Sequence, residues 1–217
     1  MYWNDLRIAL FTTFVFTLLS TFATAQPLPT DIDTAEQAPE EFKIEFETSK
    51  GGFVITAHRK WSPKAVDRLY QLVKHNYFDS MMVYRVLPKY VVQFGWTDSP
   101  KVNRAWMDAP IPDEPVKHTN SLGTVAFARS GPNSRSNQLF INMNHNTPLD
   151  TLQFKGVTGF PPVGQVTSGF NNLMRLNGEY GNQPAMVQDS IIKQGNDFLK
   201  RRYPRLDMIY WARLSTR

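Results

Sequence analysis

The feature that most constrains this fold is the alternation of apolar and charged residues in short segments separated by turn residues. In FKIEFE, at residues 42–47, apolar side chains occupy every second position, and FVITAH at residues 53–58 repeats the pattern after the turn SKGG. Because successive side chains of a strand point to opposite faces, this period of two indicates half-buried strands. The sequence therefore predicts a β-hairpin at the start of the ordered fold.

Short strands dominate the rest of the chain. Beyond the hairpin, the candidate strands are MVYRVL (82–87), YVVQFGW (90–96), LGTVAFAR (122–129), QLFIN (138–142) and PVGQVT (162–167). Two segments favour helices. The first begins at Ser62 and Pro63, which suit an N-cap and a first helical turn. The second is SGFNNLMRLN at residues 168–177. This pattern predicts a mainly β fold, a closed antiparallel barrel with helices capping its ends.

The first 25 residues have a different character from the rest. Residues 8–22 are apolar or hydroxyl-bearing throughout, and Ala-Thr-Ala follows them. This is the pattern of a secretory signal peptide, with cleavage expected after Ala25 and a periplasmic or secreted product. Because Asp5 offsets the charge of Arg7, an uncleaved membrane anchor is the alternative. In both cases the folded part lies outside the cytoplasm.

The mature chain reads as a short leader and one domain. Residues 26–41 hold three prolines, several acids and few apolar groups, which favours a flexible leader. No internal repeat or second boundary follows, so residues 42–217 form one domain. Its last part, about residues 185–217, has spaced apolar positions and is expected to pack on the body of the domain.

Composition excludes several classes of function. The net charge of +5 is modest, and the densest basic run, Lys200 to Arg202, fits a solvated helix face better than a nucleic-acid patch. The absence of cysteine excludes thiol catalysis, disulfide exchange and a cysteine zinc site. The histidines show no metal-ligand spacing; they are His58, His75, His118 and His145. No nucleic-acid partner and no metal are therefore expected.

One polar loop leads directly into an apolar strand. In SGPNSRSNQLFIN, residues 130–142, turn-forming residues and a polar run precede Leu139, Phe140 and Ile141. The segment is a hairpin loop that enters a core strand, or it lines a groove with a polar wall and an apolar floor. The local sequence leaves both interpretations open.

Several ordered motifs carry a resemblance to a known family. VYRVLPKYVVQFGW, GTVAFARSGPNSRSNQLFIN and FPPVGQVTSGFN together resemble the cyclophilin family of peptidyl-prolyl cis-trans isomerases. The similarity runs from about Phe42 to Asn177. It implies an eight-stranded closed antiparallel β-barrel capped by two α-helices, with a substrate groove on its outer surface. The segment QGNDFLKRRYPRLDMIYWARL resembles an extension of some bacterial-type members. Together with the signal pattern of residues 1–25, this resemblance predicts an exported member of the bacterial type.

The resemblance also implies functional positions. Arg85 and Gln93 stand at catalytic positions. The implied substrate-binding residues are Tyr90, Val91, Arg129, Gln138, Phe140, Leu149 and Phe160. Two positions depart from the family pattern, because Pro148 replaces a tryptophan and Phe160 replaces a histidine. These departures motivate an alternative function, a module that binds proline-containing segments without fast turnover.

The chemistry implied by the family needs no cofactor. Rotation about an X–Pro bond breaks no covalent bond, so a catalyst must only bind the twisted amide better than either planar isomer. Arg85 would donate to the prolyl nitrogen, whose lone pair becomes available when resonance is lost. The expected partners are proline-containing polypeptides in exported proteins, and the expected state is a monomer.

Overall fold

The structure is a computed structural model that describes residues 26–215. The predicted signal peptide, residues 1–25, lies outside the described residues. The strands are β1 (Glu41–Thr48), β2 (Phe53–His58), β3 (Met81–Met82), β4 (Arg85–Leu87), β5 (Val91–Phe94), β6 (Thr124–Phe127), β7 (Leu139–Asn142), β8 (Gln153–Phe154), β9 (Val157–Thr158), β10 (Pro162–Ser168) and β11 (Met208–Leu214). The α-helices are α1 (Pro63–Lys74), α2 (Pro100–Met107), α3 (Phe170–Met174) and α4 (Gln188–Arg202). Short 3₁₀ turns are η1 (Pro29–Asp31), η2 (Arg59–Trp61), η3 (Thr147–Asp150) and η4 (Pro184–Val187).

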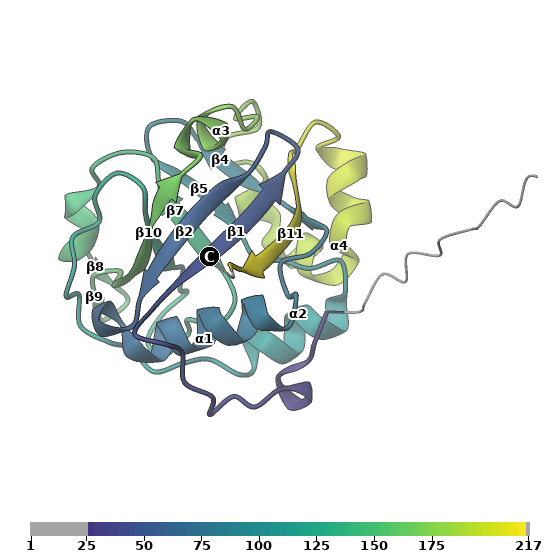
Figure 1. The fold of residues 1–217 in the computed structure, drawn as a ribbon. Coiled ribbons are helices and arrows are strands. Elements are labelled where there is room, and N and C mark those ends of the chain that lie inside the picture. The colour runs from purple at the N-terminus through teal and green to yellow at the C-terminus, as the bar shows by residue number, and fades with distance from the viewer. Residues whose placement is uncertain (1–25, 216–217) are drawn as a thin grey trace, which may run out of the picture.

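Nine strands form one curled antiparallel sheet (Figure 1). Their order is β3-β11-β1-β2-β10-β6-β7-β5-β4, while β8 and β9 form a separate hairpin. The outermost strands β3 and β4 are separated in the chain by Val83 and Tyr84 alone, so the chain itself joins the two edges of the sheet. If β3 and β4 are counted as one interrupted strand, the sheet has the eight strands that the sequence analysis expected.

Because side chains alternate between the two faces of a strand, the apolar residues of the sheet form two separate clusters. Directly opposed residues share a face of the sheet. Val92 pairs with Ile141, and Ile141 with Val125, and all three belong to the main core inside the curl. The next positions along, such as Phe140 and Ala126, belong to a separate small cluster on the other face. The apolar side chains of QLFIN therefore serve two different faces, which combines the two interpretations that the sequence left open.

Helix α1 covers one end of the curled sheet and α3 the other (Figure 1). Ser62 is the N-cap residue of α1, as predicted, but its side chain does not cap the helix. Instead, its hydroxyl donates to the Glu114 carboxylate, which accepts bonds from the amides of Lys64 and Ala65. A carboxylate from a distant loop thus satisfies the free N–H groups of the first turn.

Helix α2 was not predicted, and of α4 only the helix face at Lys200 to Arg202 was expected; the two helices pack against each other. Helix α2 follows Ser99, whose hydroxyl accepts a bond from the amide of Val102 at 3.4 Å. It buries Trp106 completely. Helix α4 is interrupted at Gly195, which has a non-helical backbone conformation. The expected pair of end-capping helices is present, and α2 and α4 are additions on the side of the sheet.

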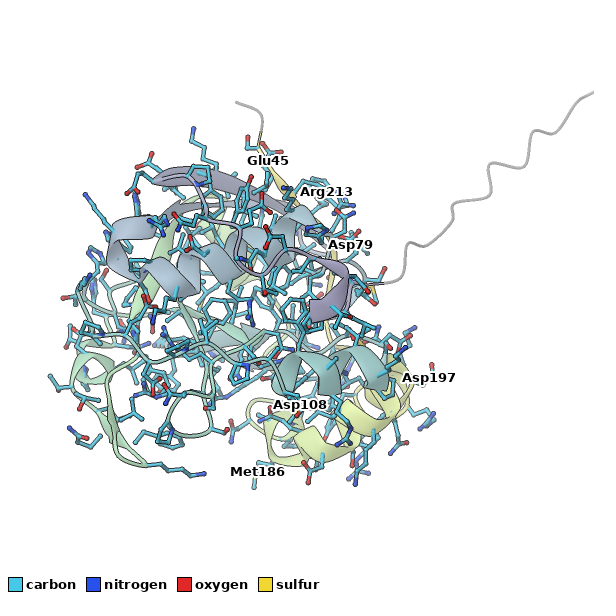
Figure 2. All side chains as sticks on the ribbon, turned by 90° about the horizontal axis from the view of Figure 1, so that it is seen from below. Glu45, Asp79, Asp108, Met186, Asp197 and Arg213 are labelled. Atoms are coloured by element: carbon cyan, nitrogen blue, oxygen red, sulfur yellow. The ribbon has the colours of Figure 1, made fainter. Side chains whose placement is uncertain are left out.

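The carboxyl-terminal segment is part of the sheet. Strand β11 lies between β1 and β3, and its Arg213 forms an ion pair with Asp79 after α1 (Figure 2). Two guanidinium nitrogens reach the carboxylate at 2.6 and 2.8 Å. The segment that resembled an extension packs on the body, as expected, and its strand β11 also pairs with both β1 and β3.

The structure differs from the expectation of a flexible leader at residues 26–41. Leu28 and Ile32 pack against the main core. The Trp106 indole donates to the carbonyl of Pro27 at 2.8 Å, and the Gln71 side chain donates to the carbonyls of Thr34 and Glu36. Side chains from distant parts of the chain donate hydrogen bonds to this backbone. The composition of residues 26–41 alone does not indicate these contacts.

Candidate active site

The two predicted catalytic residues face each other across adjacent strands. Arg85 on β4 pairs with Gln93 on β5, and Gln93 pairs in turn with Phe140 on β7. The Nη1 group of Arg85 donates to Oε1 of Gln93 at 2.9 Å. Directly opposed residues project from the same face, so the guanidinium, the amide and the Phe140 ring form one row on the outer face of the sheet.

Two hydrogen-bond donors near this row have no protein partner within the described residues. They are Nε of Arg85 and Nε2 of Gln138, and both atoms are buried. The fully buried Tyr84 hydroxyl donates to Oε1 of Gln138 at 3.0 Å, which fixes the amide orientation. Burial raises the pKa of Tyr84, so it stays a neutral donor. Buried donors are rarely left unsatisfied, so these two unpaired groups distinguish this part of the sheet.

A small cluster of apolar side chains, the apolar notch, lies beside the row. Its buried residues are Val91, Ala126, Phe140 and Leu149, and its partly buried residues are Leu87, Ala128 and Phe160. The rings of Phe140 and Phe160 meet edge to face at 5.8 Å. Four predicted binding residues, Val91, Phe140, Leu149 and Phe160, therefore lie together. An apolar notch of this kind suits a pyrrolidine ring, which has no hydrogen-bond donor.

Tyr90 lies at the rim of the site. It is 39% exposed, and Cζ of Arg85 lies 5.9 Å from the centre of its ring. This distance is at the outer limit of a cation–π contact. Tyr90 is therefore close to Arg85, but it does not belong to the apolar cluster around Phe140.

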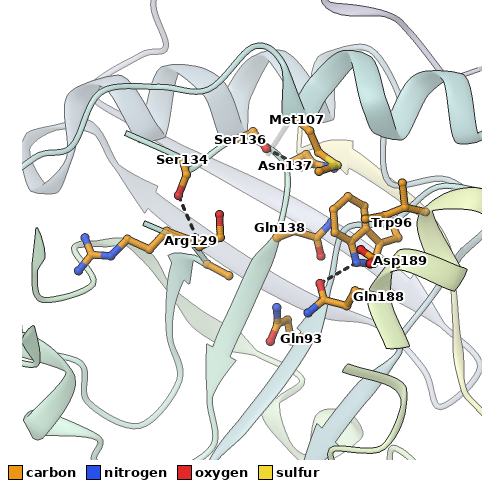
Figure 3. A pocket seen from close by; sticks show the side chains of 13 residues that line it. Gln93, Trp96, Met107, Arg129, Ser134, Ser136, Asn137, Gln138, Gln188 and Asp189 are labelled. Carbon is orange, nitrogen blue, oxygen red and sulfur yellow. Dashed lines mark hydrogen bonds between the residues drawn. The ribbon is translucent and has the colours of Figure 1, made fainter. Parts of the chain in front are cut away.

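Arg129 contributes to the groove through its backbone rather than its side chain. The guanidinium is directed away from Gln138 and Gln93 in Figure 3 and is fully buried. It stacks on the Phe160 ring at 4.5 Å and lies 3.8 Å from Asp113. Burial lowers the pKa of Arg129, and Asp113 opposes that change. The side chain thus supports the pocket from behind.

A cavity of about 320 Å³ opens beside Gln93 (Figure 3). Its polar wall comes from residues 128–138, and most of this wall belongs to the loop that begins at Ser130, for which a groove wall was one of two interpretations of the sequence. The opposite wall was missed by the sequence analysis and consists of Trp96, Met107, Gln188, Asp189 and Ile192. No local pattern marked these residues, because they come from the segment after β5, from α2 and from α4 and meet only in the folded chain.

Among residues 26–215, no group of three or more His, Cys, Asp or Glu side chains is arranged to hold a metal ion. The candidate site consists instead of amide and guanidinium donors beside an apolar notch. This arrangement can bind an extended peptide on the outside of a curled sheet and hold a proline ring next to a fixed cation. Those properties define a class of protein that binds proline-containing peptides without forming a covalent intermediate.

Comparison with known proteins gives the family. The model of the cyclophilin type peptidyl-prolyl cis-trans isomerases matches residues 43–196, and the chain belongs to this family. A similar protein is peptidyl-prolyl cis-trans isomerase ppi1 of Schizosaccharomyces pombe, 31% identical over 137 residues that cover 61% of this chain and 83% of that protein. Another is a peptidyl-prolyl cis-trans isomerase of Acinetobacter baylyi, 28% identical over 130 residues that cover 59% of this chain and 68% of that protein.

Solved structures show the same fold. A cyclophilin type isomerase of Cryptosporidium parvum superposes with a TM-score of 0.59 at 14% identity, covering 82% of this chain and 99% of that one. The same protein in the presence of the dipeptide Ala-Pro gives a TM-score of 0.58. The mainly β, cyclophilin-like fold class is therefore confirmed. The protein is a peptidyl-prolyl cis-trans isomerase, which accelerates rotation about X–Pro bonds.

Proposed function

We propose that this isomerase acts on exported proteins and that Arg85 is its catalytic group. The proposal for Arg85 rests on one observation. The guanidinium is hydrogen-bonded to Gln93 in the same cross-strand row as Phe140, at the edge of the apolar notch. A proline ring held on Phe140 would bring its amide nitrogen next to a fixed donor.

The energetic requirement is selective binding of the twisted amide. The barrier to peptide-bond rotation is about 18–20 kcal/mol, because the nitrogen shares its lone pair with the carbonyl. Each tenfold acceleration needs about 1.4 kcal/mol of binding that exists only in the twisted state. A donor at the prolyl nitrogen provides such binding, since that nitrogen accepts a hydrogen bond only when resonance is lost.

The geometry suggests a division of roles. The ring of Phe140, with its neighbours Leu149 and Phe160, would hold the pyrrolidine ring. Gln93 accepts from Arg85 through Oε1, so its Nε2 group is left to donate to the carbonyl of the residue before proline. Holding both sides of the bond lets Arg85 act on the nitrogen between them. The Ala-Pro dipeptide named with the Cryptosporidium structure is a ligand of the chemistry that this site would take.

Turnover of a short Ala-Pro peptide tests the role of Arg85. We expect Arg85→Ala to lower kcat/KM by about 10²–10³-fold, the usual cost of losing one preorganised donor. Arg85→Lys should restore little activity, because an ammonium lacks the planar fork of donors. Cis–trans exchange measured by NMR gives the rates. Parent-level turnover by a folded Arg85→Ala variant would refute the assignment.

The export proposal depends on residues 1–25. Their apolar run and the small residues before Gln26 support a cleaved secretory signal. We expect the full chain, expressed in a bacterium with two membranes, to be recovered from the periplasm with the mass of a protein that begins at Gln26. A control chain without residues 1–25 should stay in the cytoplasm. Cytoplasmic recovery of the full chain at its uncleaved mass would contradict export, and membrane recovery would favour the anchor.

A further inference from the structure

The cavity beside Gln93 continues the groove away from the apolar notch. The strands that form the notch also lead into the cavity. On β5, Val91 belongs to the notch, and Gln93 two residues later lines the cavity. Phe140 likewise belongs to the notch, and Gln138 two residues earlier lines the cavity. Two residues along a strand cover about 7 Å. An extended peptide with its proline on Phe140 would therefore place a side chain one or two residues away at the mouth of this cavity.

The far wall of the cavity is held in a fixed position. The Trp96 indole, which is nearly buried, donates to Oε1 of Gln188 at 3.1 Å, at the start of α4. Further along α4, the amide of Asn196 donates to the Asp98 carboxylate at 2.6 Å. These two bonds tie α4 to the segment that follows β5. The indole face and the helix therefore form a preorganised wall opposite the loop of residues 128–138.

Asp189 is the charged side chain that this wall presents to the cavity (Figure 3). Within the described residues it has no hydrogen-bond or ion-pair partner, and Lys193 one turn later does not pair with it. The other charged lining residue, Arg129, directs its guanidinium away toward Asp113. An acid in the first turn also stabilises the helix dipole, a role that needs no cavity. Here the same carboxylate lines a cavity together with the indole of Trp96 and the thioether of Met107.

We propose that this cavity is a specificity pocket for a lysine or arginine side chain of the substrate, carried by the second residue before proline. The proposal rests on the role of Arg85 and Phe140 in positioning proline, argued above. The aliphatic stem of a basic side chain packs on Trp96, Met107 and Ile192, and its cationic head reaches the Asp189 carboxylate. The residue lies on the amino side because Gln93, which would hold the preceding carbonyl, also lines the cavity.

Matched peptides test the pocket. We would measure cis–trans exchange by NMR for Ala-Lys-Ala-Pro-Phe, Ala-Ala-Ala-Pro-Phe and Ala-Glu-Ala-Pro-Phe with blocked ends. The intact protein should prefer the lysine peptide over the alanine peptide by about fivefold in kcat/KM, the scale of a charge pair that is not fully buried. The glutamate peptide should be the poorest substrate. The preference should shrink in 1 M NaCl, where the Debye length is about 3 Å.

Two variants of α4 provide the comparison. Asp189→Asn should bring the lysine-to-alanine ratio close to one. Asp197→Asn makes the same charge change at an exposed position of α4 outside the cavity lining, and it should keep the parent ratio (Figure 2). Equal rates for the three peptides with intact protein, or an unchanged preference in Asp189→Asn, would overturn the proposal.

The test separates this inference from the proposed catalytic role. If Arg85→Ala abolishes turnover while the three peptides are treated alike by intact protein, the catalytic role stands and the pocket assignment is wrong. If intact protein isomerises none of the peptides, calorimetry still measures their binding. Tighter binding of the lysine peptide that is lost in Asp189→Asn would support the pocket, and equal affinities would overturn it.

Discussion

Among single residues, neighbours on strand β7 differ in function, because one faces the candidate site and the others face the core. Phe140 projects into the outer notch, while Leu139 and Ile141 belong to the core inside the curl. All three side chains are at least 95% buried, so burial alone does not distinguish the binding residue from the structural ones. The pairing partners distinguish them, because Phe140 opposes Gln93 and Ile141 opposes Val92.

This difference predicts that one conservative substitution lowers activity and that another lowers only stability. Phe140→Leu should lower kcat/KM by about tenfold or more, the scale of shape changes in an apolar binding pocket. Ile141→Val should reduce the free energy of unfolding by about 0.5–1.5 kcal/mol and leave the kcat/KM of the folded protein unchanged. Peptide turnover and urea unfolding of both variants provide the measurements. If Phe140→Leu turns over peptide at the parent rate, the proline pocket is misassigned.

The side chain of Arg129 is buried behind the candidate site. The resemblance implied a binding residue, but the guanidinium is buried against Phe160 and near Asp113. Arg135 lies 3.8 Å from the same carboxylate and forms an ion pair with Glu114 at 3.1 Å. These buried charges hold the loop whose other side lines the cavity. Their contribution to binding is therefore to position backbone, not to touch substrate.

At the scale of elements, α4 depends on one glycine. Gly195 has φ of 60° and ψ of −148°, a conformation that side-chain-bearing residues rarely adopt. A Cβ atom there would lie 2.4 Å from the carbonyl oxygen of Asp98. The kink brings α4 against the segment after β5. This contact helps to fix the position of α4, which forms one wall of the cavity beside Gln93.

Two glycine substitutions separate backbone strain from steric contact. Gly156→Ala, at φ of 85° with no atom within 4 Å of the added Cβ, should cost about 1–2 kcal/mol of unfolding free energy. Gly195→Ala should cost about 3 kcal/mol or more, because the clash with Asp98 adds to the strain. Urea unfolding measures both. Equal losses would show that the approach of α4 to Asp98 is not close in solution.

At the scale of the whole molecule, the two ends of the described chain complete the fold. Strand β11 pairs with β1 and β3, so the sheet requires residues from near the carboxyl terminus. Residues 26–38 pack on α1 and α2 through the contacts of Leu28 and Ile32 and through bonds from Gln71 and Trp106. The part of the chain between residues 26 and 215 contains no helix long and apolar enough to cross a membrane.

Local patterns in the sequence were enough to predict the strands of the main sheet except β11. Alternation of apolar residues specifies which side chains share a face, and this pattern is local, so the predicted strand segments and α1 correspond to observed elements. The resemblance, carried by motifs such as VYRV and NQLFI, supplied the positions Arg85, Gln93 and Phe140. Strand pairing then brought these three into one row.

Three features follow only from the packing of the whole chain: the cavity beside Gln93, the direction of the Arg129 side chain and the contacts of residues 26–41. Trp96, Met107 and Asp189 line one space although they lie on different elements, and no periodicity relates them. Hydrogen bonds such as those from Gln71 and Trp106 satisfy the leader backbone from a distance. Local patterns encode the face on which a residue lies, whereas contacts between distant elements depend on how the complete chain packs.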